Sequence, residues 1–422
     1  MMRFILVLFG LGFAAFAVAV LQSLPFSAQR AAVIAIGSVA AVISLICFAS
    51  APIRRRSLHG AVIVNVIAAI VACYAGEIYV ASKQDSVHNK VRAMRAGGED
   101  VVYKYWSDSL MVDGVEYVTI YGFPDIYTLF CNEVRVWVSY RADEIGYNNP
   151  KGIWNEKLDA VLVGDSFTHG ACEETSNTIA GRMRASGLKV ASAGYSQAGP
   201  LRELAALVET VARYRPPIVY WNYFSGNDLK DLKTEGAMPV LPRYRDEPGF
   251  TQDLYANRDK IDPAHRAQFE QYLTTLTQSQ MVSWKDVLLL RNIRARLQLS
   301  VRGGMPESTD IPTPEELADL EKVLRRAHDV VAGWGGELRF VYLPYESELA
   351  EATAVTEKTR ALVKATAGRA GLKIIDLTPR FQEEPNARGL FNFYNGHYAT
   401  SGYAVVAKTL ADDLRNRLTP AK

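Results

Sequence analysis

The sequence has almost no excess of charge of either sign. Its 422 residues include 47 Lys and Arg against 45 Asp and Glu, which gives a formal net charge of +2. A protein that binds nucleic acid needs a basic surface for the phosphates, and this balance leaves no such footprint. Internal repeats and low-complexity tracts are absent as well. We therefore predict no nucleic-acid partner, and the length suffices for a small membrane region and one sizeable globular domain.

Histidine is also scarce, with six residues in the chain. His88, His265 and His328 stand in charged surroundings, and their spacing is not that of metal ligands. Zinc sites in particular need such ligands in closely spaced groups. We therefore predict no metal site.

Long apolar runs are confined to roughly the first eighty residues. They extend from Phe4 to Val20, from Ala31 to Ala49 and from Ala61 to Ala81. Each approaches the roughly 20 residues that cross a hydrocarbon core as a helix. Arg54-Arg55-Arg56, between the second and third runs, is expected on the cytoplasmic side by the positive-inside rule. We predict a transmembrane region with three helices over residues 1–83, in the cell (inner) membrane, with the rest of the chain facing the periplasm or exterior.

The first run has a second interpretation. Ala17-Val18-Ala19 resembles a processing site, so the run is also a candidate signal peptide. Cleavage would leave the other two helices and the same outward-facing remainder. The predicted location of that remainder is therefore the same under both interpretations.

The C-terminal part alternates between strand-like and helix-like segments. Strands are expected near residues 159–164, 188–193, 217–224, 337–343 and 372–377, with helices over 314–331 and 357–370 among the segments between them. Such alternation is typical of a parallel sheet covered by helices on both faces, which binds ligands beyond the carboxyl ends of its strands. We predict an α/β fold with three αβα layers.

A Gly-Asp-Ser turn follows the first of these strands. Gly164-Asp165-Ser166 comes directly after the apolar run 158–163. A serine between a buried strand and a helix exposes its hydroxyl, and the helix N-terminus offers backbone N–H groups to developing negative charge. Ser166 is therefore a candidate nucleophile. The alternative is that Asp165 and Ser166 only cap the following helix.

Three later segments carry further candidates. Ser192-Ala193-Gly194 offers a glycine whose N–H can approach a reacting atom closely. Gly226-Asn227-Asp228 ends another apolar run, and the Asn227 side chain can donate to an oxyanion. Tyr394-Asn395-Gly396-His397 precedes the last helical segment and offers an imidazole as general base.

Ser, Gly, Asn and His in this order resemble the four blocks of the SGNH (GDSL-type) hydrolase family, over roughly the last two-thirds of the chain. The resemblance implies a flavodoxin-like hydrolase domain that needs no cofactor. It implies that Ser166 attacks an ester carbonyl and that His397 takes its proton. It also implies an oxyanion hole made of the Ser166 N–H, the Gly194 N–H and the Asn227 side chain.

The last block departs from the family pattern. The family usually has an aspartate two or three residues before the histidine, where this chain has Asn395 and Tyr394. An Asn can hold the imidazole in one tautomer but cannot stabilise its charged form. We expect Asn395 or a backbone carbonyl to orient His397, with a carboxylate such as Asp376 as the alternative. Ser192 is a smaller departure, because many members have asparagine there.

His169 completes the group of supporting residues, together with Asp165, Gly226 and Asp228. It lies three residues after the candidate nucleophile. One interpretation places it in the pocket, against a leaving group. The other leaves it solvated in the first helical turn.

Two further segments frame the candidate domain of residues 156–422. Residues 84–155 are expected to form a small β-rich lead-in packed on the core, with strands over 115–121 and 134–140. Residues 229–312 interrupt the α/β alternation and are predicted to form a lid, with a helix from Trp284 to Leu299. Cys131 and Cys172 are a candidate disulfide in an oxidising compartment, with two buried free thiols as the alternative.

Together these features predict a membrane-anchored serine esterase or acyl-transferring enzyme. Its expected substrate is an acyl, notably O-acetyl, ester of a cell-surface glycan, since the domain faces outward at a membrane. A lipase or thioesterase acting on a lipid ester is one alternative, and a catalytically weakened glycan-binding or assembly protein is another. The expected partners are the acylated substrate, the membrane and a candidate membrane-bound acyl donor.

Overall fold

A computed structural model describes residues 4–9, 11–12, 43, 45–47, 49, 56–82, 87–132, 137–279, 290, 311–350, 353–392 and 396–418. The chain divides into two compact units. An N-terminal unit comprises residues 1–86 and 277–303, and a main unit comprises residues 87–276 and 304–422. Each unit is described separately below.

The N-terminal unit contains one long helix, α3 (Arg56–Ser82). Its segment His59–Tyr79 has 21 residues and a mean hydropathy of 2.1, and 6% of the window is buried. Among the described residues it is the one helix long and apolar enough to cross a membrane. The other two expected spans lie largely outside the described residues, so the structure supports one candidate span and gives no support to the predicted multi-pass arrangement.

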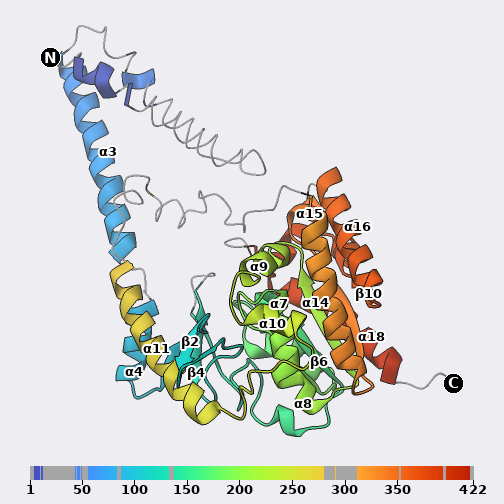
Figure 1. Ribbon diagram of the computed structural model, residues 1–422. Coiled ribbons are helices and arrows are strands. Elements are labelled where there is room, and N and C mark those ends of the chain that lie inside the picture. The colour runs from blue at the N-terminus through green and yellow to red at the C-terminus, as the bar shows by residue number, and fades with distance from the viewer. Residues whose placement is uncertain are drawn as a thin grey trace. The chain divides into compact units, whose positions relative to one another are not determined.

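The main unit is built on a five-stranded parallel sheet in the order β10-β9-β8-β6-β7 (Figure 1). The strands are β6 (Ala160–Gly164), β7 (Val190–Ser192), β8 (Ile218–Phe224), β9 (Glu337–Leu343) and β10 (Lys373–Asp376). In chain order the strands therefore lie 2-1-3-4-5, which is the flavodoxin-like arrangement of a doubly wound sheet. This confirms the predicted fold class, and each strand lies within a residue or two of its predicted position.

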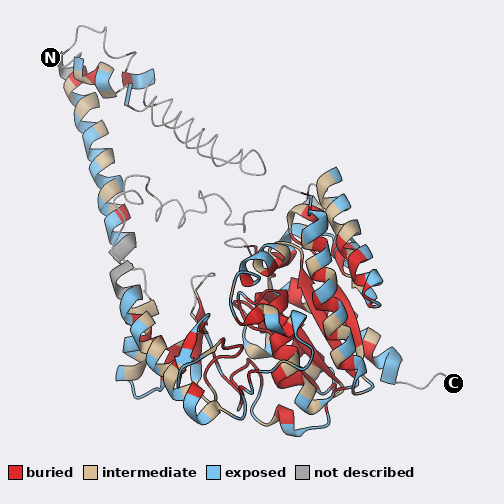
Figure 2. Cartoon of the chain, in the orientation of Figure 1, coloured by how far each residue is buried: buried red, intermediate tan, exposed pale blue. Residues whose placement is uncertain are grey.

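Helices cover both faces of the sheet, because its strands alternate side chains between two apolar clusters. On β8, Val219, Trp221 and Tyr223 face one cluster, which includes residues of α7, α14 and α16. Tyr220 and Phe224 face the other, which includes residues of α6 and α18. Figure 2 shows the sheet as the most continuously buried part of the chain.

Further helices complete the main unit, and α14 begins at a recognisable sequence signal. They are α5 (Ser166–His169), α6 (Ile179–Ala185), α7 (Pro200–Ala206), α8 (Ala212–Tyr214), α14 (Pro314–Ala332), α15 (Ser347–Ala350), α16 (Ala354–Arg369), α17 (Thr378–Gln382) and α18 (Thr400–Leu418), with short helices η1 (Ile153–Asn155), η2 (Thr175–Asn177), η3 (Leu207–Val211) and η4 (Ala387–Leu390). Thr313 and Glu316 form a capping box at the start of α14, in which each side chain accepts from the other residue's N–H. Both predicted helices, 314–331 and 357–370, correspond to observed ones.

The lead-in contains a helix as well as strands. Its elements are α4 (Val87–Ala96), β1 (Val101–Tyr103), β2 (Leu110–Val112), β3 (Val115–Tyr117), β4 (Tyr127–Cys131) and β5 (Val138–Arg141). Strands β1, β4 and β5 form one small sheet, and β2 and β3 form a hairpin. Asn149 joins the lead-in to the core sheet, since its side chain accepts from the Ser192 N–H and donates to the Ser192 carbonyl, both at 2.8 Å.

The segment after β8 supplies three described helices, α9 (Asp228–Glu235), α10 (Leu241–Asp246) and α11 (Arg258–Ser279). Helices α9 and α10 pack against α7 and α14. Phe269 and Leu273 of α11 join an apolar cluster with lead-in residues such as Phe123 and Leu129. Apart from residue 290, the predicted helix 284–299 lies outside the described residues, so the lid stays a prediction.

Candidate active site

The nucleophile turn forms where β6 enters α5. Asp165 caps the helix, and its Oδ1 accepts from the Phe167 N–H at 2.9 Å. A Cβ atom on Gly164 would lie 2.2 Å from the Thr168 Oγ1, so the strand can approach the helix this closely only with glycine. Ser166 is 8% exposed and stands at the carboxyl edge of the sheet.

The structure brings Ser166 and His397 together across the chain. The Ser166 Oγ lies 2.9 Å from the His397 Nε2, although 231 residues separate them. The His397 ring packs against the Phe167 ring, with centroids 5.0 Å apart. This is hydrogen-bonding distance for transfer of the serine proton to the imidazole.

The expected orienting group, Asn395, lies outside the described residues. The alternative carboxylate, Asp376, is held elsewhere: its Oδ2 accepts from the Lys364 Nζ at 2.6 Å and its Oδ1 accepts from the Thr378 N–H at 3.0 Å. Those partners offset the effect of burial and keep the Asp376 pKa below its usual value. The structure therefore gives no role to Asp376 at the imidazole.

Gly194 follows β7 and lies against the nucleophile helix. A Cβ atom there would meet the Thr168 Cβ at 2.5 Å and the His169 backbone nitrogen at 2.8 Å. The Gly194 N–H donates to the Ser192 Oγ at 3.3 Å, while the Ser192 hydroxyl donates to the Thr168 carbonyl at 3.0 Å. Ser192 thus contacts a group that the family resemblance assigns to the oxyanion.

Asn227 stands at the N-terminus of α9. Its side-chain amide donates to the Asp231 carboxylate one turn further on. Asp228 is buried, and its Oδ2 accepts from the Phe224 N–H at 2.8 Å, which closes the turn that contains Gly226. The sequence analysis did not single out Asp231, although a carboxylate four residues after Asn227 on a helix is a recognisable signal.

Cys131 and Cys172 form a disulfide, with their Cα atoms 5.6 Å apart. Cys131 ends β4 of the lead-in, and Cys172 follows the nucleophile helix after Gly170, which ends α5 in a left-handed conformation with φ 86°. The bond therefore ties the lead-in to the rim of the nucleophile turn. Cys172 itself has a positive φ of 59°, a conformation uncommon for a residue with a side chain.

His169 lies neither in solvent nor against an open pocket, in contrast to both sequence-based interpretations. It is 1% exposed. Its Nδ1 accepts from the Ser196 N–H at 3.0 Å, and its Nε2 lies 2.7 Å from the Tyr140 hydroxyl. Burial holds its pKa well below the usual value. The ring packs beside Tyr195 and Phe130, so His169 connects the nucleophile helix to the lead-in as a neutral side chain.

Carboxyl side chains of the nucleophile turn, α7 and α9 lie close to one another. This acidic cluster consists of Asp165, Glu203, Asp228, Asp231 and Glu235. Burial, the charge of Asp165 and further neighbouring carboxylates raise the pKa of Asp228 well above its usual value. Burial is also the main reason why the pKa of Asp165 is raised to about 7 and that of Asp231 to about 6. Among the described residues, no group of His, Cys, Asp and Glu side chains has an arrangement that could hold a metal ion.

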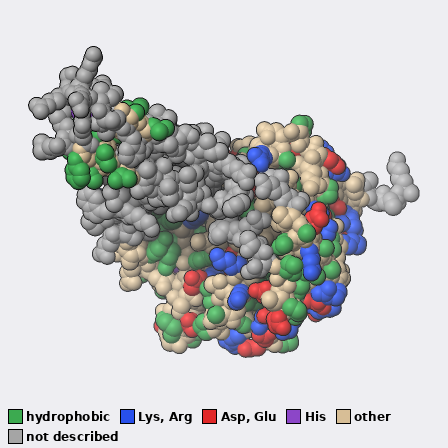
Figure 3. Space-filling view, turned by 90° about the horizontal axis from the view of Figure 1, so that it is seen from above, with side chains coloured by type: hydrophobic (Ala, Val, Ile, Leu, Met, Phe, Trp, Pro, Cys, Tyr) green, Lys and Arg blue, Asp and Glu red, His purple; other side chains and the backbone are tan. Residues whose placement is uncertain are grey.

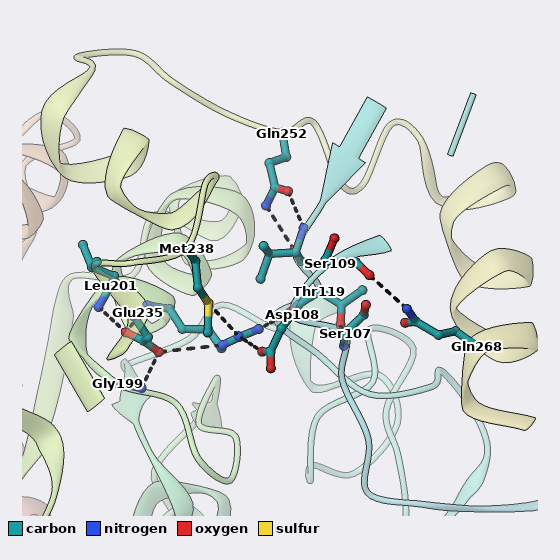
Figure 4. Close-up of polar contacts among 12 residues, drawn as sticks. Ser107, Asp108, Ser109, Thr119, Gly199, Leu201, Glu235, Met238, Gln252 and Gln268 are labelled. Atoms are coloured by element: carbon teal, nitrogen blue, oxygen red, sulfur yellow. Dashed lines mark hydrogen bonds and ion pairs between the residues drawn. The ribbon is translucent and has the colours of Figure 1, made fainter. Parts of the chain in front are cut away.

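Two members of the cluster differ in their partners. Glu235 accepts from the N–H groups of Gly199 and Leu201 at 2.7 and 2.9 Å, as Figure 4 shows, and lies 3.7 Å from the Arg202 guanidinium. Glu203 is 1% exposed, and neither of its oxygens has a hydrogen-bond partner among the described residues. Burial and the charges of the neighbouring carboxylates, that of Asp228 first, raise the pKa of Glu203 well above its usual value.

Several solved structures are similar to this chain. A lipase/acylhydrolase from Enterococcus faecalis matches 63% of this chain and 99% of its own, at 13% identity and a TM-score of 0.36. A G-D-S-L family protein from Desulfitobacterium hafniense matches 60% and 97%, at 13% identity and a TM-score of 0.28. The acetyl xylan esterase Est2A from the rumen bacterium Butyrivibrio proteoclasticus matches 75% and 85%, at 11% identity and a TM-score of 0.32.

No protein-family model matches the chain, and no curated protein matches its sequence. The identities and TM-scores of the solved structures are low. The assignment of chemistry therefore rests on the residues of this chain: the Gly-Asp-Ser turn, the glycine and asparagine at the ends of the neighbouring strands, and the histidine before the last helix.

Proposed function

We propose that the protein is a serine esterase or acyltransferase of the SGNH type. The observation that carries the proposal is the 2.9 Å distance between the Ser166 Oγ and the His397 Nε2, at the carboxyl edge of a doubly wound sheet. A hydroxyl within hydrogen-bonding distance of an imidazole is the minimal arrangement for an activated serine nucleophile. Ligands of such sheets bind at this edge.

The proposed reaction is acyl transfer in two steps. The His397 Nε2 takes the Ser166 proton while the Oγ attacks the acyl carbonyl. The Ser166 N–H, the Gly194 N–H and the Asn227 amide stabilise the oxyanion. The imidazolium then gives its proton to the leaving alkoxide, which leaves an acyl-enzyme. Water or an acceptor hydroxyl, deprotonated by His397, attacks this ester and regenerates Ser166. The chemistry uses no group beyond the chain's own side chains and backbone.

The substrate is proposed to be an O-acetyl ester of a cell-surface glycan. This rests on the expectation that α3 anchors the chain, alone or with the two apolar runs before it, so that the main unit faces outward. A membrane-bound acyl donor then becomes the partner when the reaction is transfer. A lipid ester is the competing substrate.

One feature favours a second candidate, a glycan-binding protein with little catalysis. Of the three proposed oxyanion donors, Gly194 already gives its single N–H to Ser192, and Asn227 uses one of its two amide hydrogens for Asp231. The Gly194 N–H can act on the substrate oxyanion only if its bond to Ser192 gives way. A binding protein has no such requirement.

Labelling with a fluorophosphonate distinguishes the two candidates. The full chain in detergent is expected to react at Ser166, located by mass spectrometry, and the Ser166→Ala and His397→Ala variants are expected not to react. Serines that react without a base do so slowly, so the His397 variant tests activation rather than mere exposure. A folded wild-type protein that stays unlabelled would favour the binding protein.

A further inference from the structure

A pocket of about 500 Å³ adjoins Asn227. Its walls come from the β8–α9 turn, α9, the segment that starts α14, the β9–α15 connection and the first turns of α16. It therefore lies at the carboxyl ends of β8 and β9, where doubly wound sheets bind ligands. Its wall includes the residue proposed to hold the oxyanion, so a bound ester would place its remaining groups here.

Helix α9 presents a basic side to this pocket. Lys230 and Lys233 line it, and both are exposed. Neither forms an ion pair within the described part of the chain. The acidic residues of the same helix lie on its other side, where Asp228 and Glu235 are buried and Asp231 is half-buried. The helix thus separates its charges, with the cations toward the pocket. Figure 3 shows basic and acidic side chains mixed over the face of the main unit that it draws.

The pocket's own carboxylates are engaged. Glu316 accepts from the Thr313 N–H at 3.0 Å in the capping box of α14. Glu348 is buried and accepts from the Ser225 hydroxyl, from the Tyr345 N–H at 3.0 Å and from the Tyr342 hydroxyl at 2.9 Å. Burial raises the Glu348 pKa. A hydrogen bond does not neutralise Glu316, so this carboxylate stands beside the two lysines, whose ammonium groups are the pocket's cations.

The rest of the lining combines apolar and hydroxyl-bearing side chains. Leu229, Ile311 and Pro312 are its aliphatic residues. Hydroxyl-bearing side chains are more numerous and come from several walls. The ammonium groups can hydrogen-bond to a polyhydroxylated ligand, whereas a lipid chain would leave them without partners. The Ser225 and Tyr342 hydroxyls already donate to Glu348 but can still accept from a ligand.

We propose that this pocket binds an acidic sugar unit of the glycan substrate, with Lys230 and Lys233 holding its carboxylate, so that the enzyme prefers acetyl esters on uronic-acid residues to esters on neutral ones. This rests on the proposed esterase function. Lys230 and Lys233 of α9 would then determine the preference for acidic sugars, one to two helical turns after Asn227, which is proposed to hold the oxyanion.

The test compares two probes that differ in charge, O-acetylated oligogalacturonate and its methyl-esterified form. For the full chain in detergent, kcat/KM is expected to be about tenfold higher for the acid form, the order of a lost charge-assisted hydrogen bond. The preference should fall in 0.5 M salt, since salt screens exposed charges.

The Lys230→Gln/Lys233→Gln double variant is expected to lose the preference, and the Lys230→Arg/Lys233→Arg double variant is expected to keep it. Lys157→Gln, an exposed lysine before β6 at the opposite edge of the sheet, is the matched control and should not change it.

Binding separates this inference from the esterase proposal. Calorimetry of the Ser166→Ala protein with trigalacturonate needs no turnover, and the double Gln variant should weaken the Kd about tenfold. If trigalacturonate binding depends on the lysines but the wild-type protein has no esterase activity, the pocket is supported and only the enzyme proposal is refuted. Equal rates on the acid and methyl-ester probes, or faster hydrolysis of a phospholipid ester, would overturn the acidic-sugar assignment while the esterase stands.

Discussion

Replacing Glu203 with Gln is expected to stabilise the protein at pH 8. The carboxyl is 1% exposed and has no hydrogen-bond partner among the described residues, while four other carboxyls of the acidic cluster act on it. An ionised carboxylate in such a place is unfavourable, so the folded protein retains protons that the unfolded chain has released. An amide of nearly the same shape removes the charge and keeps the packing.

The magnitude follows from the raised pKa values. A group whose folded-state pKa is raised contributes stability that is complete below its unfolded-state pKa and is lost as the pH rises through the folded-state value. For Asp165, a rise from 3.8 to about 7 corresponds to a loss on the order of 4 kcal/mol across that interval. Each retained proton makes the free energy of unfolding fall by about 1.4 kcal/mol per pH unit. Removing Glu203 should make this slope shallower, because one of the groups whose pKa is raised in the folded state is lost.

The measurement is thermal unfolding of the full chain in detergent, followed by tryptophan fluorescence at pH 5, 6.5 and 8. The wild-type Tm should fall as the pH rises. The Tm of Glu203→Gln should fall less and exceed the wild-type Tm at pH 8, by roughly 2 °C for each kcal/mol of added stability. Glu209 is the matched control, because its carboxylate accepts from the Tyr244 hydroxyl and the Gln252 N–H at 2.6 Å and from the Leu254 N–H at 3.1 Å. Glu209→Gln should be less stable than wild type, by about 1–3 kcal/mol. A Glu203→Gln protein with the wild-type slope, or less stable at pH 8, would refute the reasoning.

Three further changes test the site. Gly194→Ala would place a Cβ atom 2.5 Å from a side chain of the nucleophile helix, and we expect fluorophosphonate labelling to fall by about 10²-fold or more while circular dichroism still shows a folded protein. Asp231→Ala removes the acceptor that orients Asn227 and should lower kcat more than KM, with rescue by Asp231→Asn; a higher kcat would instead mean that Asp231 competes with the oxyanion. Cys131→Ser/Cys172→Ser removes the bond between the lead-in and the nucleophile turn and should destabilise folding by about 2–5 kcal/mol in denaturant titrations; unchanged stability would contradict a structural role.

The fold was predictable because its signals are local. Each core strand is an apolar run that ends in a turn, and the helix at 314 begins with the Thr-Pro-Glu-Glu pattern of a capping box. The order of the four blocks then placed Ser166 and His397 in one site, although only tertiary contacts bring the two side chains within 2.9 Å. The lead-in was harder, because its strands are three to five residues long and α4 breaks the expected β pattern.

The contacts around the site were not predictable, because each joins segments whose spacing carries no signal. Glu203 is an ordinary helical glutamate in the sequence, and only the fold surrounds it with other carboxyls. Ser192 was noted as a departure from the family, but its hydrogen bond with Gly194 depends on how β7 meets the nucleophile helix. The pocket is likewise assembled from four separate segments.

Helix α9 connects the acidic cluster to the pocket, and the two properties depend on each other. If the cluster were fully ionised, its negative charge would cancel the field of Lys230 and Lys233 at a distance of one helix diameter. Burial raises the pKa values of Glu203 and Asp228 well above their usual values and those of Asp165 and Glu235 to about 7, so the cluster gains protons as the pH falls through neutrality. The same burial that makes the protein less stable at high pH therefore leaves the pocket side of α9 positive. An anionic ligand is thus expected to bind more tightly as the pH falls from 8 to 6, in parallel with the rise in stability.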